Sequence, residues 1–403
     1  MKPNISVINY WHTQYGGIVT AYALQEILKS LDCNVKLVDN MTTKELIMHK
    51  KSFAKKFKEN NLSVTSNLDS HFNLEKLNNS FEIFITGSDQ VFRTKYITHL
   101  FSQYLLTYTT ADKKRIAFSA SFGVGKEQFL KETSDKDMEI MKEAMKAFDY
   151  VSVREKSGID ICRDVFGIDA EWIIDPVFIL NKQQYDDLSD KSQKDYKSKI
   201  VSYVLRPNKD YDKTYKYLSK KYDTKVKKLA YTNVSLENWL SAIKNCRLLV
   251  TDSFHGVCFA IIFNKPFICI AQDVNGKARL DSIFELLGIE NQSISSVNEI
   301  YYKDCIFKID YDSVNKRISE EASKGLETLK RILAMPIGKQ NEKVQSRITY
   351  LENRVQDLEK QANLGYQLKR YVWNKWLKVY HLYLPKSVKN MIKVFKNIIK
   401  GSN

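Results

Sequence analysis

Residues 5–38 read ISVINYWHTQYGGIVTAYALQEILKSLDCNVKLV, and this stretch decides the fold of the chain. Its first apolar run, residues 5–8, predicts a strand, and a glycine turn follows at Tyr15-Gly16-Gly17. Apolar residues then recur at helical spacing over 19–31, and residues 34–38 alternate as a second strand. Two strands joined by a helix predict a parallel sheet, which helices cover on both faces.

The same alternation continues along the first half of the chain. Further strands are predicted where short apolar runs end in small or polar residues, at 81–86, 115–119, 150–153 and 172–174. A lysine-rich stretch over 181–199 has the composition of a linker. These limits predict a first α/β domain over residues 1–180.

Strands and helices alternate again after the linker. Strands are predicted at 200–205, 225–230, 247–250 and 266–270, and a further amphipathic helix is predicted over 313–334. A second α/β domain is therefore expected over residues 181–335. Because parallel sheets bind ligands at the carboxyl ends of their strands, we expect an α/β fold of two doubly wound, Rossmann-like domains facing a common cleft.

Length and composition agree with two globular domains and an extension. The chain has 403 residues, which is too many for a single hydrophobic core. Of these residues, 43% are apolar. Its six cysteines show no C-x-x-C spacing and several lie in apolar runs, which predicts buried thiols in a reducing compartment. The N-terminus lacks the pattern of a signal peptide, and no run of about 18 apolar residues occurs, so a cytoplasmic protein is expected.

Residues 336–403 form a third segment, a C-terminal helical extension with its own charge pattern. A heptad pattern over 344–358 predicts either a short coiled-coil seam, which makes a homodimer possible, or a single helix packed on the body. Nine basic residues and no acidic ones follow Gly365, in a chain with a net charge of +16. Tryptophans and aliphatic residues recur among them at roughly helical spacing over 366–400, the pattern of a helix on an anionic membrane surface. A helix packed on the body is the alternative, and a nucleic-acid partner is not expected because no recognition fold accompanies the charge.

Two turns in the first domain carry candidate ligand-binding residues. Gly16 and Gly17 precede a helix, whose N–H groups and dipole attract anions, although plain turn geometry is the alternative. The turn after the strand at 81–86 has small residues that let a ligand approach the backbone and polar side chains that can hold it, although a helix-capping turn is the alternative. Its candidate residues are Ser88, Asp89, Gln90 and, close behind them, Arg93.

His255 is the strongest catalytic candidate. It follows the strand at 247–250 and opens a helix, and its imidazole can give or accept a proton near neutral pH; a buried core histidine is the alternative. The polar run before it includes Asp252 and Ser253. Arg154 follows another strand and suits a phosphate or carboxylate, or else a salt bridge to a nearby acid. No group of His, Cys and Asp has the spacing of metal ligands, so no metal is expected.

Seven short motifs occur in a fixed order between about residues 9 and 275. They are Gln14-Tyr15-Gly16-Gly17, Ala21-Tyr22-Ala23-Leu24-Gln25, Gly87-Ser88-Asp89-Gln90-Val91-Phe92, Ala120-Ser121-Phe122-Gly123, Val151-Ser152-Val153-Arg154-Glu155, Asp175-Pro176-Val177-Phe178 and Thr251-Asp252-Ser253-Phe254-His255-Gly256. As an ordered set they resemble the motifs of the polysaccharide pyruvyl transferase family. The residues after 336 lie outside this resemblance.

The resemblance implies a GT-B-like fold and transfer of the enolpyruvyl group of phosphoenolpyruvate to a sugar, as a cyclic ketal. It implies that His255 is the general acid that protonates the donor's methylene carbon, and that Arg154 is one of the arginines that hold the donor; Asp175 belongs to a matching motif. Phosphoenolpyruvate is a co-substrate, so no cofactor is expected. Characterised members usually carry an arginine two residues before the histidine, where this chain has Ser253. The candidates for that charge are Arg93, Arg206, Arg247 and Arg279.

Three functions are compatible with these patterns. The first is pyruvyl transfer to a surface polysaccharide, such as a capsule or exopolysaccharide, or to its lipid-linked precursor, by an enzyme on the inner face of the cell membrane. The second is a glycosyltransferase or other group transferase with a nucleotide-sugar donor, which Ser253 favours. The third is a non-catalytic, membrane-associated scaffold of polysaccharide assembly, which would have no need of His255.

Overall fold

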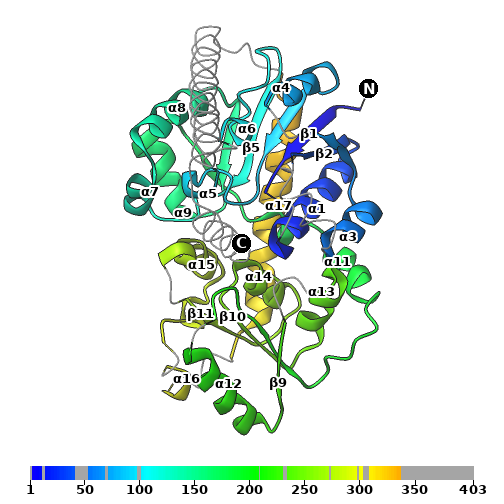
Figure 1. Ribbon diagram of the computed structural model, residues 1–403, viewed down its shortest axis with the longest axis vertical. Helices are drawn as coiled ribbons and strands as arrows, with labels where there is room; N and C mark the ends of the chain where they lie inside the picture. The colour runs from blue at the N-terminus through cyan, green and yellow to red at the C-terminus, as the bar shows by residue number, and fades with distance from the viewer. Residues whose placement is uncertain are drawn as a thin grey trace, which may run out of the picture. The chain divides into compact units, whose positions relative to one another are not determined.

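Two parallel β-sheets organise the protein in the computed structural model (Figure 1), which describes residues 2–10, 14–40, 53–68, 71–97, 101–207, 209–229, 234–271, 274–296, 299–302 and 308–336. The first sheet has the strand order β3-β2-β1-β4-β5-β6-β7, and the second has the order β12-β11-β10-β8-β9. The strand pairings in both sheets are parallel. The predicted α/β fold of two doubly wound domains is therefore confirmed.

The strands are short, and those in the middle of each sheet are buried on both faces, as parallel strands between two helical layers must be. In the first sheet they are β1 Asn4–Ile8, β2 Asn34–Asp39, β3 Val64–Asn67, β4 Ile83–Thr86, β5 Lys114–Ala120, β6 Tyr150–Val153 and β7 Glu171–Trp172. In the second they are β8 Ile200–Tyr203, β9 Val226–Lys228, β10 Leu248–Thr251, β11 Phe267–Ile270 and β12 Ser293–Ile294.

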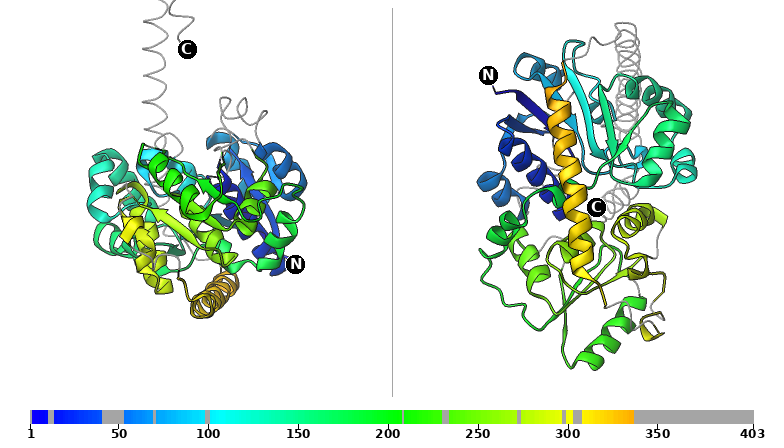
Figure 2. Two further views of the ribbon diagram at one scale, coloured as in Figure 1. Left: turned by 90° about the horizontal axis from the view of Figure 1, so that it is seen from below. Right: turned by 180° about the vertical axis from the view of Figure 1, so that it is seen from behind.

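Helices connect the strands and cover the sheets (Figures 1 and 2). Those before β8 are α1 Tyr15–Ser30, α3 Phe53–Asn61, α4 His71–Leu74, η1 Glu75–Asn79, α5 Thr94–Ile97, α6 Phe101–Tyr104, α7 Lys126–Glu132, α8 Asp135–Met145, α9 Lys156–Ile161, η2 Cys162–Phe166, α10 Pro176–Ile179 and α11 Lys182–Ser189. Those after it are α12 Lys209–Tyr222, α13 Leu236–Asn245, α14 Phe254–Ile262, α15 Val274–Leu287, η3 Glu290–Gln292, α16 Glu299–Tyr302 and α17 Tyr311–Ala334. None of the helices described here is long and apolar enough to cross a bilayer.

Each sheet has a point where the direction of winding reverses. In the first sheet the chain passes from β1 outward to β2 and β3, and then returns to place β4 on the other side of β1. In the second sheet the same reversal separates β8 from β10. Loops at the carboxyl ends of such strands diverge and leave a crevice, which is where open α/β sheets bind ligands.

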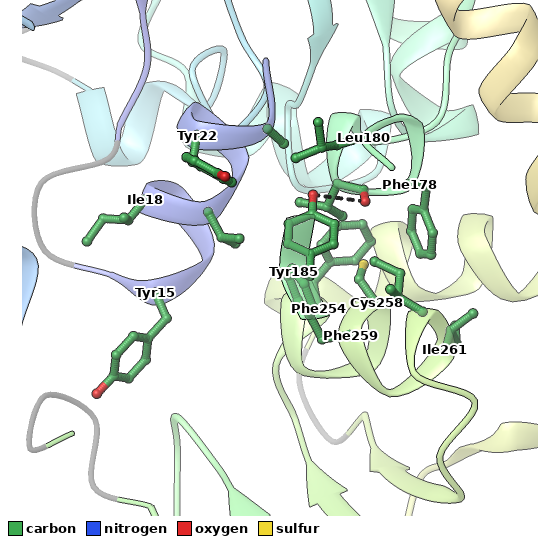
Figure 3. Packing of buried hydrophobic residues seen from close by; sticks show 14 of the residues in the cluster. Tyr15, Ile18, Tyr22, Phe178, Leu180, Tyr185, Phe254, Cys258, Phe259 and Ile261 are labelled. Atoms are coloured by element: carbon green, nitrogen blue, oxygen red, sulfur yellow. Dashed lines mark hydrogen bonds between the residues drawn. The ribbon is translucent and has the colours of Figure 1, made fainter. Parts of the chain in front are cut away.

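One hydrophobic core joins the two domains, and both sheets belong to a single compact unit. Helices α1 and α14 are buried almost all round, which is expected of helices enclosed within a core. The ring of Tyr15 at the start of α1 stacks on Trp239 of α13 with centroids 5.3 Å apart. Figure 3 shows Tyr15 on α1, and Tyr185 and Phe259 close to one another in the same core.

The long helix α17 contacts elements of both domains and passes behind both sheets (Figure 2, right). It packs on α10 of the first and α15 of the second. The Nζ atom of the buried Lys114, at the start of β5, donates to the carbonyls of Ile332 and Leu333 at distances of 3.0 and 3.1 Å. A lysine among the last carbonyls of a helix satisfies acceptors that have no partner within the helix.

The predicted element positions need two corrections. The tripeptide Tyr15-Gly16-Gly17 is the first turn of α1 and not a turn before it, because these residues are buried against the second domain. Strand β3 was not predicted, since residues 64–67 carry only one apolar side chain. The predicted heptad helix over 344–358 and the basic tail over 366–400 lie outside the described residues, and the domain boundaries stay a prediction.

Candidate active site

A cavity of about 460 Å³ lies where the two winding reversals meet. Its walls come from the loops after β1, β4, β8 and β10 and from the start of α15. The first domain contributes Tyr10, Gln14, Gly16, Asp89, Gln90 and Lys95; the second contributes Tyr203, Leu205, Arg206, Asp252, Ser253, Phe254, His255, Gly276 and Arg279. The predicted cleft between strand-end loops is therefore present within one compact unit.

His255 is the second residue of α14 and lies on the wall of the cavity with only 6% of its surface exposed. Its Nε2 atom shares a hydrogen bond with the hydroxyl of Thr20 at 2.9 Å and lies 3.7 Å from a carboxylate oxygen of Asp175. The Nδ1 edge of the ring also faces α1, where a Cβ atom on Gly16 would come within 2.1 Å of Nδ1. Only glycine at position 16 allows the imidazole to approach this closely.

Asp175 is a buried carboxylate behind the imidazole. It caps α10, because its Oδ1 accepts a hydrogen bond from the backbone N–H of Val177 at 3.1 Å. Its Oδ2 accepts from Arg154 Nη1 at 2.6 Å and from the Ser88 hydroxyl at 3.2 Å. Burial alone would raise the pKa of Asp175, but the nearby imidazole of His255 and the charge of Arg154 outweigh it and lower the pKa to about 2. The carboxylate is therefore ionised at neutral pH and can hold a charged imidazolium.

Arg154 lies behind the cavity wall and not in it. Its guanidinium is fully buried and donates to Asp175, to Asp89 Oδ1 at 3.1 Å and to the carbonyl of Ser88 at 3.1 Å. These acids hold its pKa above the usual value despite burial. The prediction that Arg154 contacts the donor directly is corrected: the salt-bridge alternative describes its geometry, and it positions the two aspartates.

Arg93 likewise supports the site from behind. It is fully buried, and its Nε and Nη2 donate to Glu132 at 2.9 and 2.8 Å. Its Nη1 donates to the side-chain oxygen of Gln90 at 3.1 Å, and Gln90 packs so closely on Gly123 that a Cβ there would clash with it. Arg93 therefore orients Gln90, which lines the cavity, and the predicted direct contact of Arg93 with a ligand is corrected.

Asp252 and Ser253 line the cavity, and their side chains also hydrogen-bond to backbone N–H groups around it. The Asp252 carboxylate accepts hydrogen bonds from the backbone N–H groups of Leu205 and Arg206 at 2.6 and 2.9 Å, and burial raises its pKa. The Ser253 hydroxyl accepts from the N–H of Gly256 at 3.2 Å and caps α14. Ser253 thus fixes the start of the helix that carries the histidine.

The structure brings most of the predicted residues together. Gly16, Asp89, Gln90, Asp252, Ser253 and His255 line the cavity, whereas Ser88, Arg93, Arg154 and Asp175 form the layer behind it and Gly17 is buried in the first turn of α1. Thr20 was missed, although it follows Gly16 by four residues and so lies on the same helix face. Within the described ranges, no cluster of three His, Cys, Asp or Glu residues could hold a metal ion.

Two doubly wound domains around such a cavity define an α/β fold of the GT-B-like type. The model of the family described as polysaccharide pyruvyl transferase matches residues 15–274, and the chain belongs to this family. The family is one of transferases in polysaccharide biosynthesis, as the motifs implied. No curated protein sequence matches the chain.

Solved structures share the fold at low sequence identity. A UDP-N-acetylglucosamine 2-epimerase from Rickettsia bellii superposes with a TM-score of 0.55 at 10% identity, covering 84% of this chain and 97% of that one. The UDP-GlcNAc 2-epimerases from Neisseria meningitidis and Methanocaldococcus jannaschii give TM-scores of 0.48 and 0.44 at 9% and 13% identity, each covering 88% of this chain and 100% of theirs. The predicted GT-B-like arrangement is confirmed at the level of the fold alone.

Replacing Asp175 with asparagine should destabilise the protein in a pH-dependent way. The substitution keeps the shape but leaves Arg154 with one fewer buried counter-charge, which should lower the free energy of unfolding by about 3 kcal/mol at pH 6. The folded-state pKa of Asp175 is depressed, so its stabilising contribution is present above the ordinary carboxyl pKa near 4 and is lost as the pH falls toward 2. Urea unfolding of the wild type and Asp175→Asn from pH 6 down to pH 3 should show that the difference between their free energies of unfolding becomes smaller.

Asp164→Asn is the matched control. The pKa of Asp164 is also lowered to about 2, by hydrogen bonds with Arg163 and Lys126, but this carboxylate is solvated. Its substitution should change stability far less than that of Asp175, because water screens the pairs. Equal losses for the two variants would contradict a special role for the buried pair.

Proposed function

We propose that this protein transfers pyruvate from phosphoenolpyruvate onto a sugar of a surface polysaccharide, or of its lipid-linked precursor, as a ketal. The observation that carries the proposal is the placement of His255: one ring nitrogen is held by Thr20 and an ionised Asp175, and the other side faces Gly16 on the cavity wall. Such a histidine is oriented to act as a general acid. Family membership supplies the reaction class.

The proposed reaction uses the two ring nitrogens differently. Asp175 and Thr20 hold Nε2, and the proton on Nδ1 passes to the methylene carbon of the donor, so that C2 gains cationic character. A sugar hydroxyl attacks C2, and its proton returns to the imidazole. A second hydroxyl of the same sugar then attacks C2, the bond from C2 to the phosphate oxygen breaks, and the hydroxyl proton leaves with inorganic phosphate as the ketal closes. The low pKa of Asp175 keeps a negative charge beside the imidazolium throughout.

The charge of the cavity supports an anionic donor. Lys95, Arg206 and Arg279 line it, against the carboxylates of Asp89 and Asp252. Both carboxylates are already engaged, Asp89 by Arg154 and Asp252 by two backbone N–H groups. The positive groups therefore outnumber the acids that face them, as a site for phosphoenolpyruvate requires.

His255→Gln should separate donor binding from turnover. Glutamine keeps a polar side chain of similar reach but cannot supply the proton, so phosphate release from phosphoenolpyruvate, with a panel of sugars carrying paired hydroxyls, should fall at least about 100-fold. The melting temperature of both proteins should still rise with phosphoenolpyruvate, because binding to the folded state stabilises it. A rise with UDP-sugars alone would instead support the glycosyltransferase alternative, and unchanged turnover in His255→Gln would remove the histidine from the mechanism.

Gly16→Ala should inactivate the enzyme by displacing His255. The added Cβ would lie 2.1 Å from Nδ1, so the imidazole must rotate away from Asp175 or from the donor, and turnover should fall by about 10-fold or more. Gly125→Ala is the control, since nothing lies within 4 Å of a Cβ at that position. Comparable turnover in the two variants would show that the close approach of Gly16 to the imidazole is not needed.

The basic tail fits an acceptor held at a membrane. Its lysines and tryptophans, all outside the described residues, match a helix that lies on an anionic surface, which would place the enzyme on the inner face of the cell membrane beside a lipid-linked glycan. Deletion of residues 337–403 should abolish salt-sensitive cosedimentation with vesicles that contain anionic lipids. Vesicles of zwitterionic lipid serve as the control, and binding that survives the deletion would place the membrane contact elsewhere in the chain.

A further inference from the structure

Arg279 is a cation of the cavity wall with no ion-pair partner among the residues that the structure describes. It lies in α15, and its guanidinium carbon is 5.4 Å from the centroid of the Phe254 ring. Its Nε atom is buried and has no hydrogen-bond partner, and the described part of the chain offers no carboxylate in ion-pair contact with it. Arg154, which stacks on the same ring at 4.8 Å, is by contrast paired with two aspartates.

A guanidinium on the cavity wall that lacks an ion-pair partner is energetically unfavourable until an anion binds beside it. Burial and the neighbouring charge of Arg154 lower the pKa of Arg279 to about 10, so the group stays charged at neutral pH while lacking the solvation that water would give it. Gly276 leaves room beside the guanidinium, since a Cβ there would come within 3.2 Å of Nη2. An anion in the cavity would restore the missing partner.

Three helices begin at the same cavity and add to this positive field. Residues in or just before the first turn of α1, α14 and α15 line the walls, at Gln14 and Gly16, at Ser253 to His255, and at Gly276. None of the three helices has an acidic residue in its first turn. Their N-terminal partial charges are therefore not offset there and favour a group with two negative charges.

Ser253, Lys95, Arg247 and Arg93 are less suited to the task. The Ser253 hydroxyl is engaged in capping α14 and brings no charge. Lys95 is half exposed and lies 3.8 Å from a carboxylate oxygen of Glu132. Arg247 is exposed on the ring of Tyr222, and Arg93 is bound to Glu132, so neither lines the cavity.

We propose that Arg279 binds the phosphate group of the donor, so that α15 supplies the positive charge that Ser253 does not bring. The assignment of that phosphate to phosphoenolpyruvate rests on the proposed function. The anion subsite itself rests on the cavity, the unpaired guanidinium and the three helix N-termini. Phosphate binding therefore tests the subsite separately from the identity of the donor.

The test is calorimetric titration of the full-length protein with inorganic phosphate, pyruvate and phosphoenolpyruvate. Arg279→Met should weaken the binding of phosphate and of phosphoenolpyruvate by about 10- to 100-fold, because a charge-assisted bidentate contact is lost. The affinity of Arg279→Lys for phosphate should lie between those of the wild type and Arg279→Met, since lysine keeps the positive charge but not the bidentate guanidinium. Arg247→Met is the matched control: it removes another ring-stacked arginine, which lies outside the cavity and has no ion-pair partner within the described ranges, and this variant should bind phosphate like the wild type.

A purely structural role for Arg279 predicts a different pattern. If the residue exists to bind an anion, the ligand-free Arg279→Met protein should melt at or above the wild-type temperature, because a partly buried charge with no ion-pair partner among the described residues has been removed. Equal phosphate affinity in wild type and Arg279→Met, an effect on pyruvate alone, or a ligand-free variant that melts well below the wild type would each overturn the proposal. Phosphate binding that depends on Arg279 without any preference for phosphoenolpyruvate would support the subsite and contradict the proposed donor.

Discussion

The buried ion pair between Arg154 and Asp175 is the interaction on which the site depends. Arg154 follows β6 and Asp175 follows β7, and the guanidinium also reaches Ser88 and Asp89 after β4, so one side chain ties together three strand ends. Such a pair gains little net stability, since desolvation of both groups offsets their attraction. Its consequence is positional: the Asp175 carboxylate is fixed, ionised and aimed at a histidine from the other domain.

The second constraint is the packing that holds this histidine in place. Helices α1 and α14 are enclosed in a core shared by both domains, and the stack of Tyr15 on Trp239 joins the start of α1 to the second domain. A core packed this densely does not let the helices slide past one another. Gly16 and His255 are therefore in contact without a ligand, so the geometry proposed for catalysis is built by folding and not by substrate binding.

Sequence periodicity predicted the fold and much of the cavity, because strands and their carboxyl-end loops leave a local signal. It also pointed to His255, which lines the cavity and follows the end of β10 after a short polar run. What it could not provide is the partner of a side chain. Arg154 looked available for a ligand because Asp175 is 21 residues away and Asp89 is 65 residues away, and only the strand order brings all three together. Thr20 and Arg279 were missed or left unplaced for the same reason: each lies in a helix whose contact with the cavity depends on packing between domains.

The two arginines on the Phe254 ring show how a widely used fold acquires one particular chemistry. The backbone alone, shared with an epimerase at 10% identity, supplies a crevice with helix N-termini around it and thus a general preference for anions. Arg154 is neutralised by acids from its own domain and serves as scaffold, whereas Arg279 lines the cavity and has no ion-pair partner in the described part of the chain. The distribution of carboxylates, and not the number of arginines, thus decides which cation holds the structure and which is open to a ligand. With the role proposed for Arg279, the positive charge for an anionic donor comes from α15. Ser253, two residues before the histidine, then does not have to supply it.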